Sequence, residues 1–389
     1  MSDKSDKKTV RIFALASFLN DFGSDMIYPI WPLFVTALGA NMSVLGLLDG
    51  LGNACVSLSQ ALSGYFSDRL RKRKIFIWFG YLLSALSRIG YAFSPTWHLL
   101  IPSRILDRSG KMRGPPRDAI IAEISNHGNR GRNFGLVRAM DNLGAVCGII
   151  TTVCLFHLLG YRNLFLLAAL PSLAAVLLIV SLTRERTNAE HAFKGLRISI
   201  LNRNYFLFLV SSSLLALGSF SYSFLLVFSN RFGFKAGFIP VLYLIFTVFA
   251  FLASLPFGHI SDKVGRKAML AVGFALWTLV CFCFICFPTR AGIITGFVLF
   301  GLHRGALDTL QNTFVSELVH PDMRGSALGG FQMVIGICAL PASLIAGYLW
   351  DRFGPEAPFY FSLVITVLAI LMLVFVRADT KGSREKSAI

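Results

Sequence analysis

The sequence predicts an all-α membrane protein with twelve transmembrane helices in two six-helix bundles related by a pseudo-twofold axis. Three observations predict this fold. Hydrophobic residues make up 55% of the 389 residues and charged residues only 15%, whereas soluble domains carry about 25% charged residues. Polar segments divide the chain into apolar stretches of about 20 residues, the length that crosses a bilayer. The second half of the chain also repeats the first.

Twelve apolar stretches are long enough to cross a membrane. They are residues 10–38, 43–66, 75–94, 97–124, 133–158 and 161–182, followed by 204–229, 237–257, 267–287, 290–317, 326–349 and 356–376. Pro29 and Pro32 should break or kink the outer part of the first helix. The longest polar interruption, 183–203, predicts an N-terminal bundle (1–182), a cytoplasmic linker (183–203) and a C-terminal bundle (204–389).

The distribution of Lys and Arg predicts the orientation. Nearly all of these residues near the ends of the spans fall on one side of the membrane, and the exceptions are Arg162, Arg231, Lys235, Arg290 and Arg352. The positive-inside rule therefore places both termini in the cytoplasm. It also explains most of the net charge of +17 without a nucleic-acid partner. Short loops and a compact chain favour a bacterial inner membrane and a monomer whose partners are the lipid bilayer and a small-molecule substrate.

An internal repeat appears when the sequence is shifted by 194 residues against itself. The segment 64–69 then falls on 258–263, Glu123 on Glu317, and Arg130-Gly131 on Arg324-Gly325. A duplicated six-helix unit is typical of transporters that bind their substrate between two repeats.

The repeated segment carries a family resemblance. Gly258-x-x-x-Asp262-Lys263-x-Gly265-Arg266-Lys267 resembles the motif between helices 2 and 3 of the major facilitator superfamily (MFS). The copy that begins at Gly64 departs from it at Arg71, where the family usually has Gly. Arg104-Ile-Leu-Asp107-Arg108 resembles the helix 4 motif, with Asp107 and Arg108 where Gln and Gly are common. The resemblance covers essentially the whole chain and implies the MFS fold and transport by alternating access.

The motif copies also predict a gate on the cytoplasmic side. Asp68 and Asp262 end a helix beside a basic loop, where they can pair with Arg or with a helix N-terminus when that side is closed. The alternative is a simple stop-transfer charge. The predicted gating residues are Asp68, Arg69, Arg73, Glu123, Arg130, Asp262, Arg266, Glu317 and Arg324.

Charged residues inside the spans predict the substrate site, because each costs at least about 2.5–3.5 kcal/mol at the bilayer centre. Almost all of them lie in the first half. Helical spacing predicts a basic face of Arg104, Arg108 and Lys111, and a second polar face of Arg304, Asp308 and Gln311. The predicted substrate-binding residues are these six and Tyr28. Since acids and bases in the spans nearly balance, structural ion pairs are the alternative.

Two carboxylates on the first helix predict proton coupling. Asp21 and Asp25 are four residues apart and share one helix face. Neighbouring carboxyl groups in a partly dry cavity can hold a proton, which would couple proton entry to transport. Asp141 and Asp308 are alternative proton sites. His303 could relay a proton or could simply be hydrogen-bonded.

The favoured function is proton-coupled transport of a small polar, anionic solute, because Arg binds carboxylate or phosphate bidentately. Uptake by symport of a carboxylate, phosphate or chelate, such as a siderophore, fits a charged cavity. The alternative is an exporter of amphiphilic drugs or lipids by proton antiport, which the Phe-rich second half keeps open. Enzyme and ATP-binding motifs are absent from the sequence, and no cofactor or metal is expected beyond the proton gradient.

Overall fold

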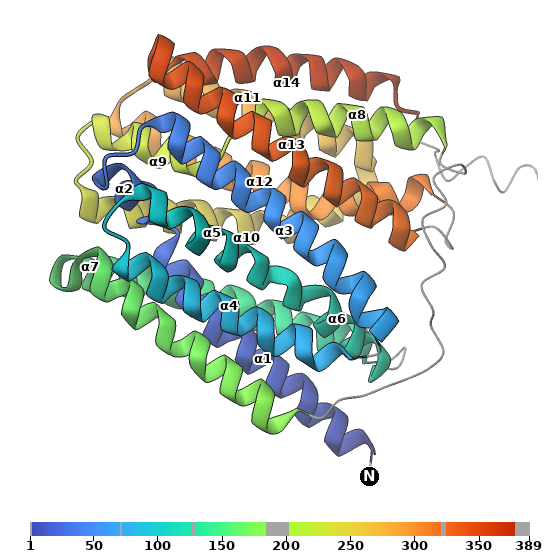
Figure 1. Cartoon of the computed structure of the whole chain (residues 1–389). Helices are drawn as coiled ribbons and strands as arrows, with labels where there is room; N and C mark the ends of the chain where they lie inside the picture. The colour runs from blue at the N-terminus through green and yellow to red at the C-terminus, as the bar shows by residue number, and fades with distance from the viewer. Residues whose placement is uncertain (1, 71, 126–128, 184–201, 320–323, 378–389) are drawn as a thin grey trace, which may run out of the picture.

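The computed structural model describes residues 2–70, 72–125, 129–183, 202–319 and 324–377, and these residues form helices and their connections without a strand (Figure 1). The first half contains α1 (Ser2–Ile27), α2 (Trp31–Ala37), α3 (Met42–Leu70), α4 (Arg73–Phe93), η1 (Trp97–Leu99), α5 (Leu100–Ser109), η2 (Gly110–Arg113), α6 (Gly114–Glu123) and α7 (Arg130–Leu182). The second half contains α8 (Arg203–Gly218), α9 (Tyr222–Arg231), η4 (Ala236–Phe238), α10 (Ile239–Val264), α11 (Arg266–Cys286), α12 (Arg290–Leu318), α13 (Arg324–Phe353) and α14 (Ala357–Phe375).

The twelve predicted spans correspond to these helices. Within the described residues, nine helical stretches are long and apolar enough to cross a membrane. One of them, 131–182, holds two predicted spans, because α7 turns back on itself at Gly160 (φ 65°), as Figure 1 shows. The two predicted spans outside the nine are 10–38 and 97–124, whose polar and charged side chains lower their hydropathy.

Two spans are broken at neighbouring positions of the repeat. The first is interrupted at residues 28–30, between α1 and α2, where Pro29 and Pro32 follow each other closely. The seventh is interrupted at residues 219–221, between α8 and α9. The 194-residue shift places 219–221 on 25–27, three residues before the first break, and brings Tyr28 onto Tyr222, the first residue of α9. A broken span leaves main-chain groups free to line a cavity inside the membrane.

In Figure 1 most of the first half, from blue to green, lies below most of the second half, from yellow-green to red, and α3 and α10 overlap where the halves meet. We name the end that carries the N-terminus and residues 72–74 the basic end, and the other end the distal end. The halves meet at the distal end, where α3 packs along α13 and α7 packs against α10. There Asp351, from the end of α13, accepts hydrogen bonds from the main-chain N–H groups of Met42 (3.1 Å) and Ser43 (2.8 Å) at the start of α3.

Glycines allow this close approach of the halves. A Cβ atom at Gly46 would collide with the carbonyl oxygen of Ser343, and one at Gly50 would lie 2.8 Å from the Cα of Leu340. In the other interface the ring of His157 lies against Gly237, and the 194-residue shift relates these two residues to Asp351 and Ser43. Since small residues let membrane helices approach backbone to backbone, the distal end is tightly closed in this conformation.

Candidate functional site

A cavity of about 350 Å³ lies between the two halves, next to both helix breaks. The first half lines it with the polar residues Tyr28, Asp49, Asn53, Arg104 and Arg108. The second half contributes mainly aromatic and apolar side chains, together with four serines (Ser212, Ser219, Ser221 and Ser343) and His303, Arg304 and Gln311. The two walls of this central cavity therefore differ in chemistry.

Arg104 is held by a buried carboxylate in the cavity wall. Its Nη2 lies 2.6 Å from Asp49 Oδ1, and both side chains are 2% exposed. The guanidinium group of Arg104 also lies 4.2 Å from the ring centroid of Trp31. Asp49 accepts further hydrogen bonds from Trp31 Nε1 (3.0 Å) and from Ser221 Oγ (2.7 Å), which belongs to the second half. The charge of Arg104 is thus compensated at Nη2, whereas its buried Nε and Nη1 have no hydrogen bond in the described structure. Asp49 joins four spans.

Arg108 is compensated less completely. It stacks 4.6 Å above the ring of Tyr28 and donates a hydrogen bond from Nη1 to the Tyr28 hydroxyl (3.3 Å). Its nearest acid among the described residues is Asp107, whose Oδ2 is 3.6 Å from Nε, and neither of these two atoms has a hydrogen bond. Arg108 is therefore the cation of the first-half wall that is most available to an anionic ligand.

The prediction that Lys111 shares a face with Arg104 and Arg108 is wrong. The helix tightens into the 3-10 turn η2 at residues 110–113, before Pro115 and Pro116 begin the next segment. A 3-10 helix has three residues per turn rather than 3.6, so the side chains after Gly110 change direction. Lys111 lies 3.8 Å from Asp21 and lines a different cavity.

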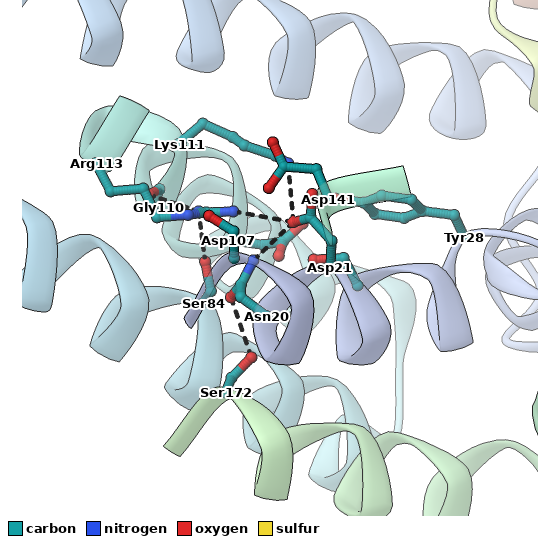
Figure 2. A network of polar contacts seen from close by, with 12 residues as sticks. Asn20, Asp21, Tyr28, Ser84, Asp107, Gly110, Lys111, Arg113, Asp141 and Ser172 are labelled. Atoms are coloured by element: carbon teal, nitrogen blue, oxygen red, sulfur yellow. Dashed lines mark hydrogen bonds and ion pairs between the residues drawn. The ribbon is translucent and has the colours of Figure 1, made fainter. Parts of the chain in front are cut away.

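This second cavity, of about 360 Å³, contains a network of ion pairs (Figure 2). Asp21 accepts from Arg113 Nη2 at 3.4 Å, and Arg113 also donates to the carbonyl oxygen of Gly110 at 2.8 Å. Asp141 lies 3.5 Å from both Arg117 and Arg138. The remaining lining residues are Gln60, Gly114, Pro115, Asp118 and Gln332. Acids and bases pair throughout this network, as the structural alternative predicted.

Asp25 differs from Asp21 although it lies only one turn further along α1. Its side chain is partly exposed, and among the described residues it has neither a hydrogen bond nor an ion pair. Lys111 and Arg108 are the positive charges that act most strongly on it. Of the two carboxylates of α1 predicted for proton coupling, Asp25 is thus the one without an ionic or hydrogen-bonded partner among the described residues.

Arg88 is a structural residue that the residue spacing did not identify. It is fully buried and donates to the carbonyl oxygens of Ala168 (2.9 Å) and Asn20 (3.0 Å), to Ser24 Oγ (2.8 Å) and to Ser172 Oγ. No carboxylate of the described chain pairs with it. Arg88 therefore fastens α4 to α1 and to the second limb of α7 with neutral acceptors.

The polar residues of α12 take different places. Arg304 and Gln311 line the central cavity, and Arg304 pairs with Asp308 at 3.4 Å, with both side chains more than half exposed. His303 is 2% exposed, and its Nδ1 lies 2.7 Å from the carbonyl oxygen of Gly273. The hydrogen-bonded alternative therefore describes the surroundings of His303 in this conformation.

The residues predicted to form a gate pair within each half at the basic end. Arg73 pairs with Glu123 in the first half. In the second half, Arg266 pairs with Glu317 (2.5 Å) and with Asp262 (2.9 Å). Two more contacts remain inside one half, namely Arg69 with the Tyr65 hydroxyl (3.1 Å) and Arg324 with the carbonyl oxygen of Ser316 (3.0 Å). The side chains of Asp68 and Arg130 lie outside the described part of the chain.

Comparison with known proteins decides the family. The sequence profile of the Major Facilitator Superfamily matches residues 13–251 and 207–389. The chain belongs to this superfamily. An uncharacterized MFS-type transporter of Methanocaldococcus jannaschii is 34% identical and is covered over 96% of each chain. Multidrug resistance protein 1 of Bacillus subtilis is 24% identical, with 95% of this chain and 97% of that protein covered.

Solved structures agree with this assignment. The crystal structure of a point mutant of the nucleoside transporter NupG has a TM-score of 0.82 with 15% identity, and the match covers 95% of this chain and all of that one. At this identity the likeness shows the MFS fold alone. The chain is therefore an integral membrane transporter of the MFS type and not an enzyme.

Proposed function

We propose that this MFS transporter moves a small anionic solute through the central cavity and couples its movement to protons. The observation that carries the proposal is Arg108, which lies in the cavity wall. Among the described residues its only ionic neighbour is Asp107, whose Oδ2 is 3.6 Å from Nε. Arginine offers several N–H donors in a fixed plane, which suits carboxylate and phosphate groups. Tyr28, Arg304 and Gln311 border the same space and would complete the binding site.

Asp25 is the proton carrier in this proposal. It has no partner of its own among the described residues, whereas Asp21 and Asp141 are held in ion pairs. A proton on Asp25 would offset the charge of an incoming anion, which favours symport. The halves would then rock around the central cavity and expose it to each side in turn. Both termini would face the cytoplasm of a bacterial cell, and one chain would suffice for transport.

Binding and coupling can be tested separately. Anions should raise the thermal stability of the purified protein by mass action, and Arg108→Gln should abolish this effect. Arg231→Gln removes a cation outside both cavities and serves as the control. If anions stabilise the Arg108→Gln protein as well as the unchanged protein, Arg108 does not bind the substrate.

Asp25→Asn should abolish accumulation driven by a pH gradient in proteoliposomes while leaving exchange of substrate across the membrane. Asp308→Asn removes an exposed, paired acid of α12 and should leave driven accumulation intact. Unchanged accumulation in Asp25→Asn would transfer the proton role to Asp21 or Asp141.

Export of amphiphilic compounds by proton antiport is the second candidate. The aromatic wall of the second half favours it, as does the similarity to a relative named multidrug resistance protein 1. This candidate predicts that lipophilic cations stabilise the protein and that Arg108→Gln leaves their effect unchanged.

A further inference from the structure

The second-half wall of the central cavity is a continuous series of aromatic rings. The ring centroids of Tyr222 and Tyr243 are 5.1 Å apart, those of Tyr243 and Phe246 are 5.4 Å apart, and those of Phe246 and Phe300 are 4.6 Å apart. All four residues line the cavity. These spacings fall within the range of about 4.5–7 Å at which aromatic rings attract each other, so the wall offers another ring a surface of matching chemistry.

The first-half wall limits the charge of the ligand. Arg104 is already paired with Asp49, so Arg108 is the cation of this wall that remains for a ligand. Arg304, on the opposite wall, is exposed and paired with Asp308. One available cation suits one negative group, whereas a multiply charged chelate would bring charge that the walls do not compensate. A cationic ligand would be repelled by Arg108.

The size of the cavity sets a third limit. Its volume of about 350 Å³ lies near the lower end of the range of about 300–1,000 Å³ for ligand pockets. A small anion without an apolar part would leave the aromatic wall in contact with water. A ligand with one or two rings and one charged group would cover both walls.

We infer that the substrate is a small aromatic carboxylate, with its carboxylate bound by Arg108 and its ring packed against Phe246 and Phe300. This inference rests on the proposed function and adds the chemical class of the solute. Ring and charge are recognised by different halves, so the ligand bridges them. Closure around the ligand would bring both recognition elements together.

The inference can be tested by measuring how four probes change the thermal stability of the full chain in detergent. Benzoate carries both features, cyclohexanecarboxylate lacks the aromatic ring, benzyl alcohol lacks the charge, and inorganic phosphate has charge alone. We expect benzoate to bind about three- to tenfold more tightly than cyclohexanecarboxylate, because attraction between aromatic rings adds to the affinity of benzoate alone. Benzyl alcohol and phosphate should bind more weakly still.

Matched variants test whether the aromatic wall of the second half causes the preference for benzoate over cyclohexanecarboxylate. Phe300→Leu and Phe246→Leu should remove the advantage of benzoate over cyclohexanecarboxylate. Phe297→Leu should retain it, because Phe297 is buried on the same helix as Phe300 but packs against Phe284 outside the cavity. If either Phe300→Leu or Phe246→Leu does not fold, the other variant still tests whether the aromatic wall causes the preference for benzoate.

The outcomes separate this inference from the proposed function. Equal binding of benzoate and cyclohexanecarboxylate, or binding of phosphate without benzoate, would overturn the aromatic class and leave anion transport standing. Benzyl alcohol that binds as tightly as benzoate, or a failure of every anion to bind, would overturn both.

Discussion

The two halves descend from one repeated unit but are held together by different forces. In the first half, Arg88 joins α4 to α1 and α7 through hydrogen bonds inside the membrane. The 194-residue shift brings Arg88 onto Phe282, which is 47% exposed on the surface of the second half. The core of the second half is instead aromatic, with Phe359 packed against Phe220, Phe228 and Phe284.

This difference indicates that the two halves contribute different chemistry to the central cavity. The polar half carries Arg108 and Asp25, to which we assign anion binding and proton transfer in the proposed function, and its hydrogen bonds hold the surrounding helices together. The aromatic half supplies shape and apolar surface. Both halves nevertheless retain a helix break beside a Tyr, Tyr28 or Tyr222, and an acid at Glu123 or Glu317. The repeat is therefore still visible in the backbone although the side-chain chemistry differs.

The largest effect is expected from Arg88→Met. Five buried acceptor atoms would lose a donor, at about 1–3 kcal/mol each, so the variant should be destabilised by about 5 kcal/mol or more. The matched substitution Phe282→Met in the other half should change the melting temperature in detergent very little. Similar melting temperatures for the two variants would contradict a polar framework in the first half.

The buried pair in the cavity wall should come next. Asp49→Asn leaves Arg104 without a counter-charge at 2% exposure, and breaking such a pair costs about 3–5 kcal/mol in soluble proteins. Adding Arg104→Gln removes the uncompensated charge and should restore part of the lost stability, as a double-mutant cycle would measure. If the second substitution makes the protein less stable, the two residues do not act as a pair.

A smaller effect should follow from Gly46→Ala, which acts where the halves meet. The new methyl group would press against the main chain of Ser343 and disfavour the closed distal end by about 1–3 kcal/mol. The readout is a thiol introduced into the cavity by Ala339→Cys in a cysteine-free background. With Gly46→Ala added, this thiol should react faster with an impermeant maleimide on the distal side than it does without Gly46→Ala. Gly329→Ala, on the same helix as Ser343 and with open space around it, is the control and should leave the rate unchanged.

The smallest effect is expected from Arg304→Gln. Its pair with Asp308 is more than half exposed, and exposed pairs contribute about 0–1 kcal/mol. The melting temperature without ligand should therefore stay close to that of the unchanged protein. A large loss of stability would mean that the second half also depends on ionic contacts.

Much of the fold could be predicted from the sequence because apolar length and the repeat are local or periodic signals. The break after α1 was predictable from Pro29 and Pro32. The break at residues 219–221 was not, since Ser-Phe-Ser carries no comparable signal. The basic face on helix 4 was predicted for a regular helix and fails at Lys111, where the 3-10 turn intervenes.

The site was harder to predict because its partners are distant in sequence. In the sequence Asp49 is a single acid in the apolar span 43–66. Its partners Arg104 and Ser221 lie 55 and 172 residues away. Residue spacing likewise could not separate Asp21 from Asp25, since both lie on one face of the same helix. The difference between them arises from Arg113, which reaches Asp21 from another span.

The contact of Asp351 with the start of α3 has a consequence for sequence variation. Its two main-chain donors are the N–H groups of residues 42 and 43, which nearly every amino acid supplies. A change of residue 42 to any amino acid other than proline therefore keeps this hydrogen bond, and only the packing of the buried Met42 side chain restricts the choice. Position 351 has no such freedom, because its carboxylate accepts both main-chain hydrogen bonds and a third from the Ser43 hydroxyl (2.6 Å).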